Sequence, residues 1–342
     1  MRAVRKLAPG RGNVEVVDAP EPQVRPGHVV IAVEAAGICG TDVHIVDDEF
    51  ATEPPVTLGH ELAGTLVDVG RDVKSWQVGD RVTSETYFST CGRCAHCRRG
   101  RPNLCSERKS IGSKRDGAFA SHVLVPATNL HRVPDGLDLE SAALTEPLAC
   151  AVHGVIDTAG AKAGDWVAIT GPGPIGLLTL QLVLAAGARA VVIGTAQDRD
   201  RLALAADLGA NATLEAGDVD DPAAWFADTT GADGADLVVE CSGAGPAVDT
   251  LLKVVAKGGR YAQMGLFGRG VTLDQDVVCY KELAVTGTNA SVPSAWPRAL
   301  ALLASGQVDA SRLVSHRFDV EAWDEALRTV RSKAGVKVVL KP

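Results

Sequence analysis

Short apolar segments separated by Gly, Pro and Asp dominate the first 150 residues of the chain. Valine-rich runs of this kind fall at residues 28–33, 62–69, 80–84 and 121–125. Runs of four to eight β-branched and apolar residues between turn formers are typical of short strands. This part of the chain therefore predicts small antiparallel strands joined by functional loops.

From about residue 164 the pattern changes to alternating strands and helices. Apolar, strand-like runs are expected at residues 166–170, 190–194, 237–240, 260–264 and 283–287. Helices are expected at residues 175–186, 199–208 and 246–256, with further amphipathic stretches at 297–305 and 320–331 and a last strand at 336–340. Strands alternating with helices predict βαβ units around a parallel sheet.

Length and charge limit the classes of function. The chain has 342 residues, enough for two domains, and 34 basic against 42 acidic residues give a net charge of −8. This balance argues against nucleic acid or an anionic membrane as a partner. The longest apolar run, residues 176–188, is too short to span a bilayer, and no apolar stretch follows the basic residues near the N-terminus. We expect a soluble, cytoplasmic enzyme.

Four cysteines crowd into one short segment. Cys91, Cys94 and Cys97 are spaced by two residues and Cys105 follows after seven. This spacing suits a loop around a tetrahedral zinc ion, and four thiolates leave no open position, so the site is predicted to be structural. Disulfides and an iron–sulfur cluster are the alternatives, but neither fits the spacing and the cellular context as well. His96 is interpreted as a bystander.

A glycine-rich turn lies where the first strand of the second region meets its helix. Gly171, Gly173 and Gly176, with Pro174 and Ile175 between them, form the pattern Gly-x-Gly-x-x-Gly. Glycines here allow a sharp turn, a close approach of the backbone to a pyrophosphate and tight helix packing. Because the turn follows an apolar strand and opens an apolar helix, it predicts dinucleotide binding rather than a purely structural turn.

The N-terminal region holds a second group of zinc-competent side chains. Cys39, the adjacent His60 and Glu61, and the distant Glu146 are the candidates. Spacing alone does not show that they converge. Taken singly, Cys39 could be an inert buried thiol and His60 a hydrogen-bonded loop histidine.

The motifs together resemble those of zinc-dependent medium-chain dehydrogenases, the alcohol dehydrogenase superfamily. Residues 39–44 (Cys-Gly-Thr-Asp-Val-His), 59–61 (Gly-His-Glu) and 146–149 (Glu-Pro-Leu-Ala) resemble the polyol (sorbitol-type) and threonine dehydrogenase branch. The resemblance implies an α/β fold in which a Rossmann doubly wound parallel sheet is inserted into a GroES-like, mainly-β catalytic domain. The implied domains are 1–149 with a zinc lobe at about 88–108, 150–287, and a return to the catalytic domain over 288–342. A homodimer or homotetramer is implied as well.

The resemblance also implies two zinc ions per chain. Cys39, His60 and Glu61 would bind the catalytic zinc, with Glu146 as an exchangeable ligand or a neighbour of the ligands. Zinc would act as a Lewis acid on the alcohol, and hydride would pass to a nicotinamide. Thr41 and His44 resemble the family's proton relay, although Thr41 could simply cap the turn and His44 could make a structural hydrogen bond.

The choice of coenzyme is predicted from the end of the second strand of the Rossmann region. NAD-dependent members carry an acidic residue there to bind the ribose hydroxyls, and this chain has Thr195 followed by Ala and Gln. We therefore favour NADP, with Thr195, Arg199 and Arg201 as candidate ligands of its phosphate, while NAD stays an alternative if Asp198 supplies the carboxylate. Leu266 is a further candidate coenzyme-binding residue.

The substrate is left open by these motifs. We favour a sugar alcohol, cyclitol or related secondary alcohol that is oxidised to a ketone. Threonine is the alternative, because the acidic loop at 46–55 is somewhat like that of the threonine branch. A non-catalytic zinc-binding relative is the alternative of another class, but such a protein is expected to have lost Cys39, His60 or Glu61.

Overall fold

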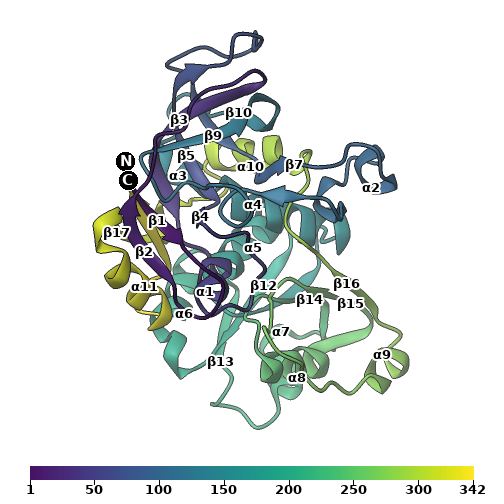
Figure 1. Ribbon diagram of the computed structural model, residues 1–342. Helices are drawn as coiled ribbons and strands as arrows, with labels where there is room; N and C mark the ends of the chain where they lie inside the picture. The colour runs from purple at the N-terminus through teal and green to yellow at the C-terminus, as the bar shows by residue number, and fades with distance from the viewer. The chain divides into compact units, whose positions relative to one another are not determined.

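The computed structural model describes residues 1–342, which divide into two compact units (Figure 1). The first unit combines both ends of the chain, Met1–Ala149 and Val292–Pro342, and the second is the central segment Cys150–Ser291.

The first unit is built on antiparallel strands. A three-stranded sheet has the order β2-β1-β4, and a larger sheet has the order β10-β6-β5-β3-β18-β17, with β9 also paired to β3. Its strands are β1 (Arg2–Lys6), β2 (Val14–Asp18), β3 (His28–Gly37), β4 (Val56–Thr57), β5 (Glu61–Val69), β6 (Arg81–Ser84), β9 (His122–Pro126), β10 (Leu130–Arg132), β17 (Val314–Asp319) and β18 (Lys337–Lys341), beside the small pair β7 (Tyr87–Ser89) and β8 (Lys109–Ser110). Its helices are α1 (Gly40–Val46), α2 (Ala95–Arg98), α3 (Leu139–Ala143), α4 (Thr145–Ala151), α10 (Ala295–Ala304) and α11 (Trp323–Arg331).

The C-terminal segment completes the first unit. Its yellow elements β17 and α11 lie beside the purple strands β1 and β2 (Figure 1). Arg2 Nε of β1 lies 3.9 Å from Glu321 Oε1. Trp323 of α11 is fully buried and its ring lies 5.7 Å from that of Phe119 in the core of this unit. β18 pairs antiparallel with the end of β3, which brings the last strand next to Gly37.

The second unit is a parallel sheet flanked by helices. Its six strands have the order β13-β12-β11-β14-β15-β16. They are β11 (Trp166–Thr170), β12 (Arg189–Gly194), β13 (Ala212–Glu215), β14 (Ala235–Glu240), β15 (Val255–Gln263) and β16 (Ala284–Gly287). The helices are α5 (Pro174–Ala185), α6 (Arg199–Asp207), α7 (Pro222–Thr230), α8 (Gly245–Val254) and α9 (Asp276–Tyr280), preceded by a π-helix at Val152–Thr158. The chain order reverses between β11 and β14, and such a switch point is where open α/β sheets bind ligands.

The predicted alternation agrees with these elements, but several short ones were not predicted. β1 and β13 each carry charged or polar residues and have no apolar run to mark them. The helix expected at 246–256 ends at Val254, because β15 already begins at Val255. None of the helices has the length and apolar character that a membrane span needs.

Candidate metal and coenzyme sites

One pair of strands brings the predicted catalytic ligands together. β3 ends at Gly37, two residues before Cys39, and β5 begins at Glu61, directly after His60; Gly37 and Glu61 are partners in the antiparallel register. Ligand atoms of Cys39, His60 and Glu61 consequently lie within 4.8 Å of one another. A thiolate, an imidazole and a carboxylate at this spacing fit a zinc ion with a fourth position left open.

Asp42 supports this group from the first turn of α1. It is fully buried, its Oδ2 accepts a 2.8 Å hydrogen bond from the Cys39 backbone N–H, and its Oδ1 lies 3.7 Å from His60 Nδ1. Burial lowers the pKa of His60, but the negative charges of Asp42, Cys39 and Glu146 outweigh burial and raise that pKa well above its ordinary value. A thiol, an imidazole and a carboxylate in one group form a donor set that fits a divalent metal.

Glu146 and Lys337 differ in how they relate to the three ligands. Glu146, on α4, is buried and its charge acts on His60, but it is not a member of the set within 4.8 Å. Lys337, at the start of β18, contacts Glu61 Oε2 directly, and both side chains are 1% exposed. Burial lowers the pKa of the Lys337 ammonium, yet Glu61, Cys39 and Asp42 together raise it above its usual range.

The two residues of the predicted proton relay lie on α1. Thr41 Oγ1 is 3.7 Å from Cys39 Sγ. His44 Nδ1 is 2.7 Å from Glu49 Oε2, and both side chains reach the surface. A carboxylate on Nδ1 orients the imidazole and leaves Nε2 for another partner.

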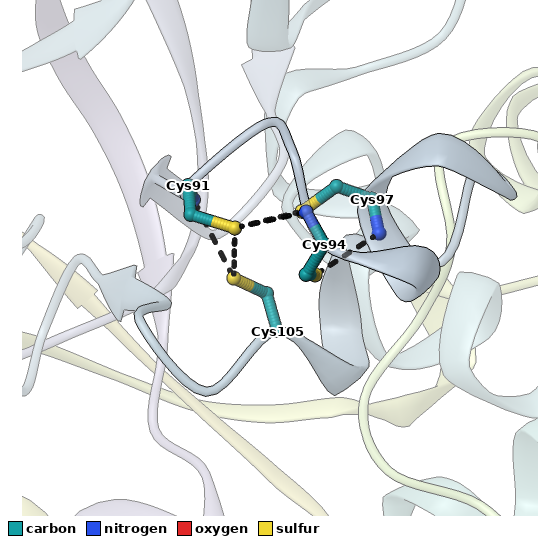
Figure 2. A group of neighbouring side chains, drawn as sticks. All are labelled: Cys91, Cys94, Cys97 and Cys105. Atoms are coloured by element: carbon teal, nitrogen blue, oxygen red, sulfur yellow. Dashed lines mark hydrogen bonds between the residues drawn. The ribbon is translucent and has the colours of Figure 1, made fainter.

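The four clustered cysteines gather in one small lobe (Figure 2). Cys91 Sγ lies 3.6 Å from Cys105 Sγ and 4.0 Å from Cys97 Sγ. Four sulfurs at about 2.3 Å from a tetrahedral zinc stand about 3.8 Å apart, whereas a disulfide requires about 2.05 Å. The backbone N–H of Cys94 points at the sulfur of Cys91, and that of Cys97 at the sulfur of Cys94.

Thiol acidity in the lobe is uneven. The backbone N–H groups of Arg93 and Cys94 lower the pKa of Cys91 to about 7. Burial and the neighbouring Cys94 raise the pKa of Cys97 to about 11. Since the thiolate form binds metal, a bound zinc would deprotonate all four cysteines.

The glycine turn has the geometry that its sequence predicts. Gly171 has a φ of +81°, and a Cβ there would lie 2.7 Å from Ser242. A Cβ on Gly176 would lie 2.1 Å from the Gly171 carbonyl oxygen, so this glycine lets α5 pack onto the turn. A Cβ on Gly173 would meet nothing within 4 Å, which leaves its backbone approachable at the N-terminus of α5, where Pro174, Ile175 and Gly176 form the first turn.

The residues predicted to select the coenzyme have partners of their own. Thr195 donates from its N–H (3.1 Å) and its hydroxyl (2.7 Å) to Asp198 Oδ2, and Arg201 lies 3.7 Å from Asp198 Oδ1. Arg199 forms a bidentate pair with Glu215. Asp198 therefore stabilises the turn after β12 in this structure.

The same architecture is found in known proteins. The alcohol dehydrogenase GroES-like domain family matches residues 25–135, and the zinc-binding dehydrogenase family matches residues 174–305. The chain belongs to the zinc-dependent alcohol dehydrogenases. This confirms the predicted fold class and the prediction of a dehydrogenase that uses zinc and a nicotinamide coenzyme.

Individual relatives of this dehydrogenase cover its whole length. Sorbitol dehydrogenase of Halalkalibacterium halodurans is 40% identical, over 100% of this chain and 99% of the relative. L-threonine 3-dehydrogenase of Thermococcus kodakarensis is 37% identical, over 100% and 98%. The crystal structure of a zinc-binding dehydrogenase from Sinorhizobium meliloti 1021, bound to NADP, superposes with a TM-score of 0.90 at 36% identity, covering 100% of this chain and 99% of that one.

Two buried charges of the dehydrogenase escaped sequence reasoning. Lys337 lies in a short strand at the far end of the chain, where nothing local marks it as a partner of Glu61. Glu240, at the end of β14, accepts hydrogen bonds from Ser242, Gly243 and Gln263. It ties the loop after β14 to the loop after β15, where the exposed Leu266 lies. The sequence feature that could have identified Glu240 is a carboxylate at the end of an otherwise apolar strand.

Proposed function

We propose that this dehydrogenase oxidises a secondary alcohol of the sugar-alcohol or cyclitol class to a ketone, with NADP as the preferred coenzyme. The observation that carries the proposal is the convergence of Cys39, His60 and Glu61, whose ligand atoms lie within 4.8 Å of one another. Zinc, when bound there, supplies Lewis acidity toward the substrate hydroxyl, and the nicotinamide accepts the hydride.

The residues of the chain then divide the remaining work. Cys39, His60 and Glu61 hold the metal, Asp42 orients His60, and Glu146 is near enough to act on the group by charge. Thr41 accepts the alcohol proton as it releases its own hydroxyl proton toward His44, and His44 releases a proton to solvent, with Glu49 holding the imidazole in place. Gly171, Gly173 and Gly176 present the N-terminus of α5 to the pyrophosphate.

Contacts of the acidic loop favour a polyol over threonine. Asp47 pairs with Arg11 (3.1 Å) and Arg331 (2.8 Å), and Glu49 contacts His44. These carboxylates are engaged within the protein, so the loop is poorly suited to bind a substrate ammonium. Threonine oxidation is retained as the second candidate because of the 37% identical threonine dehydrogenase. Initial rates with a panel of polyols, cyclitols and amino alcohols test the assignment, and a catalytic efficiency highest for threonine would overturn it.

The preference for NADP is supported by the missing carboxylate at the end of β12. Asp198 is buried and bonded to Thr195, so it is poorly placed to accept ribose hydroxyls. Arg199 is the better phosphate ligand of the two arginines, because its side chain is 71% exposed whereas that of Arg201 is 13% exposed. To bind a phosphate, Arg199 would exchange its bidentate pair with Glu215, whose side chain is 13% exposed, for the phosphate oxygens, which suit the same planar guanidinium.

Rates with each coenzyme decide this point. We expect a higher catalytic efficiency with NADP, and we expect Arg199→Ala to weaken NADP about tenfold while NAD changes little. An efficiency several-fold higher with NAD in the unmodified enzyme would overturn the preference and indicate Asp198 as the ribose ligand.

Two zinc ions per chain and assembly into a homodimer or homotetramer complete the proposal. β16 is an edge strand of the parallel sheet, its Val285 is 52% exposed, and Tyr280 just before it is 79% exposed. An exposed apolar edge invites pairing with another chain, so a second copy of this enzyme is the natural partner. Metal analysis tests the stoichiometry: one zinc per chain would favour a structural role alone. The cytoplasmic location stays a prediction.

A further inference from the structure

Lys337 is a fully buried cation whose partners all belong to the metal pocket. Its Nζ contacts Glu61 Oε2 and donates a 3.0 Å hydrogen bond to the carbonyl oxygen of Ile38. Lysine is almost never fully buried unless it is paired, and removing one partner of such a pair is strongly destabilising. The pairing is therefore a defined part of the pocket.

The backbone around the pair is shaped to hold it. A Cβ on Gly37 would lie 2.2 Å from Glu61 Oε2 and 2.6 Å from Lys337 Cε, so the pair fills the space that a side chain at the end of β3 would need. The antiparallel register of β18 with β3 delivers Lys337 to this point, and the Ile38 N–H bonds the Val338 carbonyl at 2.9 Å. The same strand end thus positions the lysine and the residues that precede Cys39.

The consequence for Glu61 follows from the chemistry of a carboxylate. The ammonium of Lys337 engages Oε2, which leaves Oε1 as the oxygen without that contact. Positive charge beside a ligand withdraws electron density from it and repels a divalent cation. A catalytic zinc site must keep one position that the substrate oxygen can enter, and a firmly held two-oxygen carboxylate would occupy it.

We propose that Lys337 is a positioning residue that restricts Glu61 to one-oxygen, readily exchanged ligation of the catalytic metal. The proposal rests on the proposed function, since it assumes that Cys39, His60 and Glu61 bind zinc. In this proposal β18 contributes to the strength with which Glu61 binds the metal, in addition to its role in the fold.

The test compares Lys337→Met with Lys337→Arg, which keeps the charge. Cobalt is exchanged into the Cys39–His60–Glu61 site while the cysteine lobe keeps its zinc. We expect K337M to shift the visible cobalt absorption and to slow chelator extraction of the metal several-fold, because Glu61 then binds more strongly. We expect kcat to fall about tenfold with little change in KM, and K337R to resemble the unmodified enzyme.

A double variant isolates the route through Glu61. In a Glu61→Gln background, K337M should change neither the spectrum nor the extraction rate, because the coupling between two residues disappears when either is removed. Faster metal loss in K337M, an unchanged spectrum, or an effect that persists in the E61Q background would each overturn the proposal. If K337M does not accumulate as folded protein, the same measurements are made on Lys337→Gln, with the same expected results.

These readouts separate the two levels of inference. Spectra and extraction rates need no substrate, so they are independent of which alcohol the enzyme oxidises. Unmodified protein that binds no metal outside the cysteine lobe would overturn the proposed function. Protein that binds metal at both sites, with K337M identical to it, would overturn only the role of Lys337.

Discussion

Single charged side chains determine what the metal pocket can do. Asp42, Glu61 and Lys337 are all buried within or beside the group that contains Cys39 and His60. Buried charges persist only when they are paired, hydrogen-bonded or bound to metal. The proposed function gives these charges a metal to hold, and single substitutions separate metal binding from proton transfer.

His60→Ala tests metal binding. We expect the variant to lose the catalytic metal. We expect kcat to fall roughly 10³-fold or more, because several kcal/mol of transition-state stabilisation depend on the ion. Coenzyme affinity, measured by fluorescence titration, should stay within about twofold, since the glycine turn is separate. Substantial turnover without metal at this site would contradict the Lewis-acid mechanism.

His44→Gln tests the relay. Positioned acid–base groups contribute about 10²-fold or more, so we expect kcat at neutral pH to fall about 100-fold, with recovery as rising pH supplies hydroxide. Glu49→Gln is the matched control, since it keeps the imidazole and changes only its 2.7 Å partner, and its effect should be smaller. A pH profile of H44Q parallel to that of the unmodified enzyme would exclude His44 from the relay.

Elements bring together residues that no local motif connects. The β3–β5 pairing joins Cys39 to His60 and Glu61, and the turn from β11 leads into the N-terminus of α5, where we expect the pyrophosphate to bind. The cysteine lobe depends on a loop and the short helix α2, with few buried residues of its own. We therefore expect the lobe to depend on a bound metal for its stability more than the strands do.

Two glycine variants separate packing from coenzyme approach. Gly176→Ala places a Cβ 2.1 Å from a backbone oxygen, so we expect it to lower the melting temperature. Gly173→Ala meets no protein atom within 4 Å, so we expect an unchanged melting temperature but coenzyme affinity weakened about tenfold, or about 1.4 kcal/mol. Coenzyme binding unaffected by G173A would show that the pyrophosphate lies elsewhere.

Cys97→Ser tests the lobe. Loss of one of four thiolates should release the structural zinc and lower the melting temperature by about 2 °C or more, as expected for a loss of about 1 kcal/mol or more. Metal content and calorimetry measure both effects. Cys279→Ser is the control, because that thiol is exposed and lies outside both clusters. A variant that keeps its zinc and melts like the unmodified protein would refute the structural role.

At the scale of the whole molecule, the two compact units carry different candidate sites. The unit formed by both chain ends holds both candidate metal sites, and the central unit holds the glycine turn. The parallel sheet of the central unit ends in β16, whose apolar side chains are exposed. Assembly of copies through this edge would cover them.

Val285→Lys tests the assembly. A lysine on an edge strand opposes strand pairing, so we expect the variant to form a smaller species by size-exclusion chromatography with light scattering. Lys substitution at Val67, which is 42% exposed in the other unit, is the matched control and should leave the mass unchanged. If V285K keeps the native mass, β16 is not the interface.

Local sequence determined the features that depend on short-range geometry. The spacing of Cys91, Cys94 and Cys97 determines how their loop can wrap an ion. A glycine-rich segment between an apolar strand and an apolar helix can adopt few backbone conformations other than a tight turn. The alternation of strands and helices likewise predicted the parallel sheet, because period and length depend only on neighbouring residues. The family resemblance added the ligand set, whose roles stay predictions.

Tertiary structure alone decided the features that depend on distant pairing. Nothing near residue 337 shows that β18 pairs with β3 and places a lysine on Glu61. Likewise, only the fold shows that Arg199 pairs with Glu215 and that Asp198 is bonded to Thr195. Such contacts follow from strand register and packing, which set the distance between side chains far apart in the chain, and a local pattern carries no information about that distance.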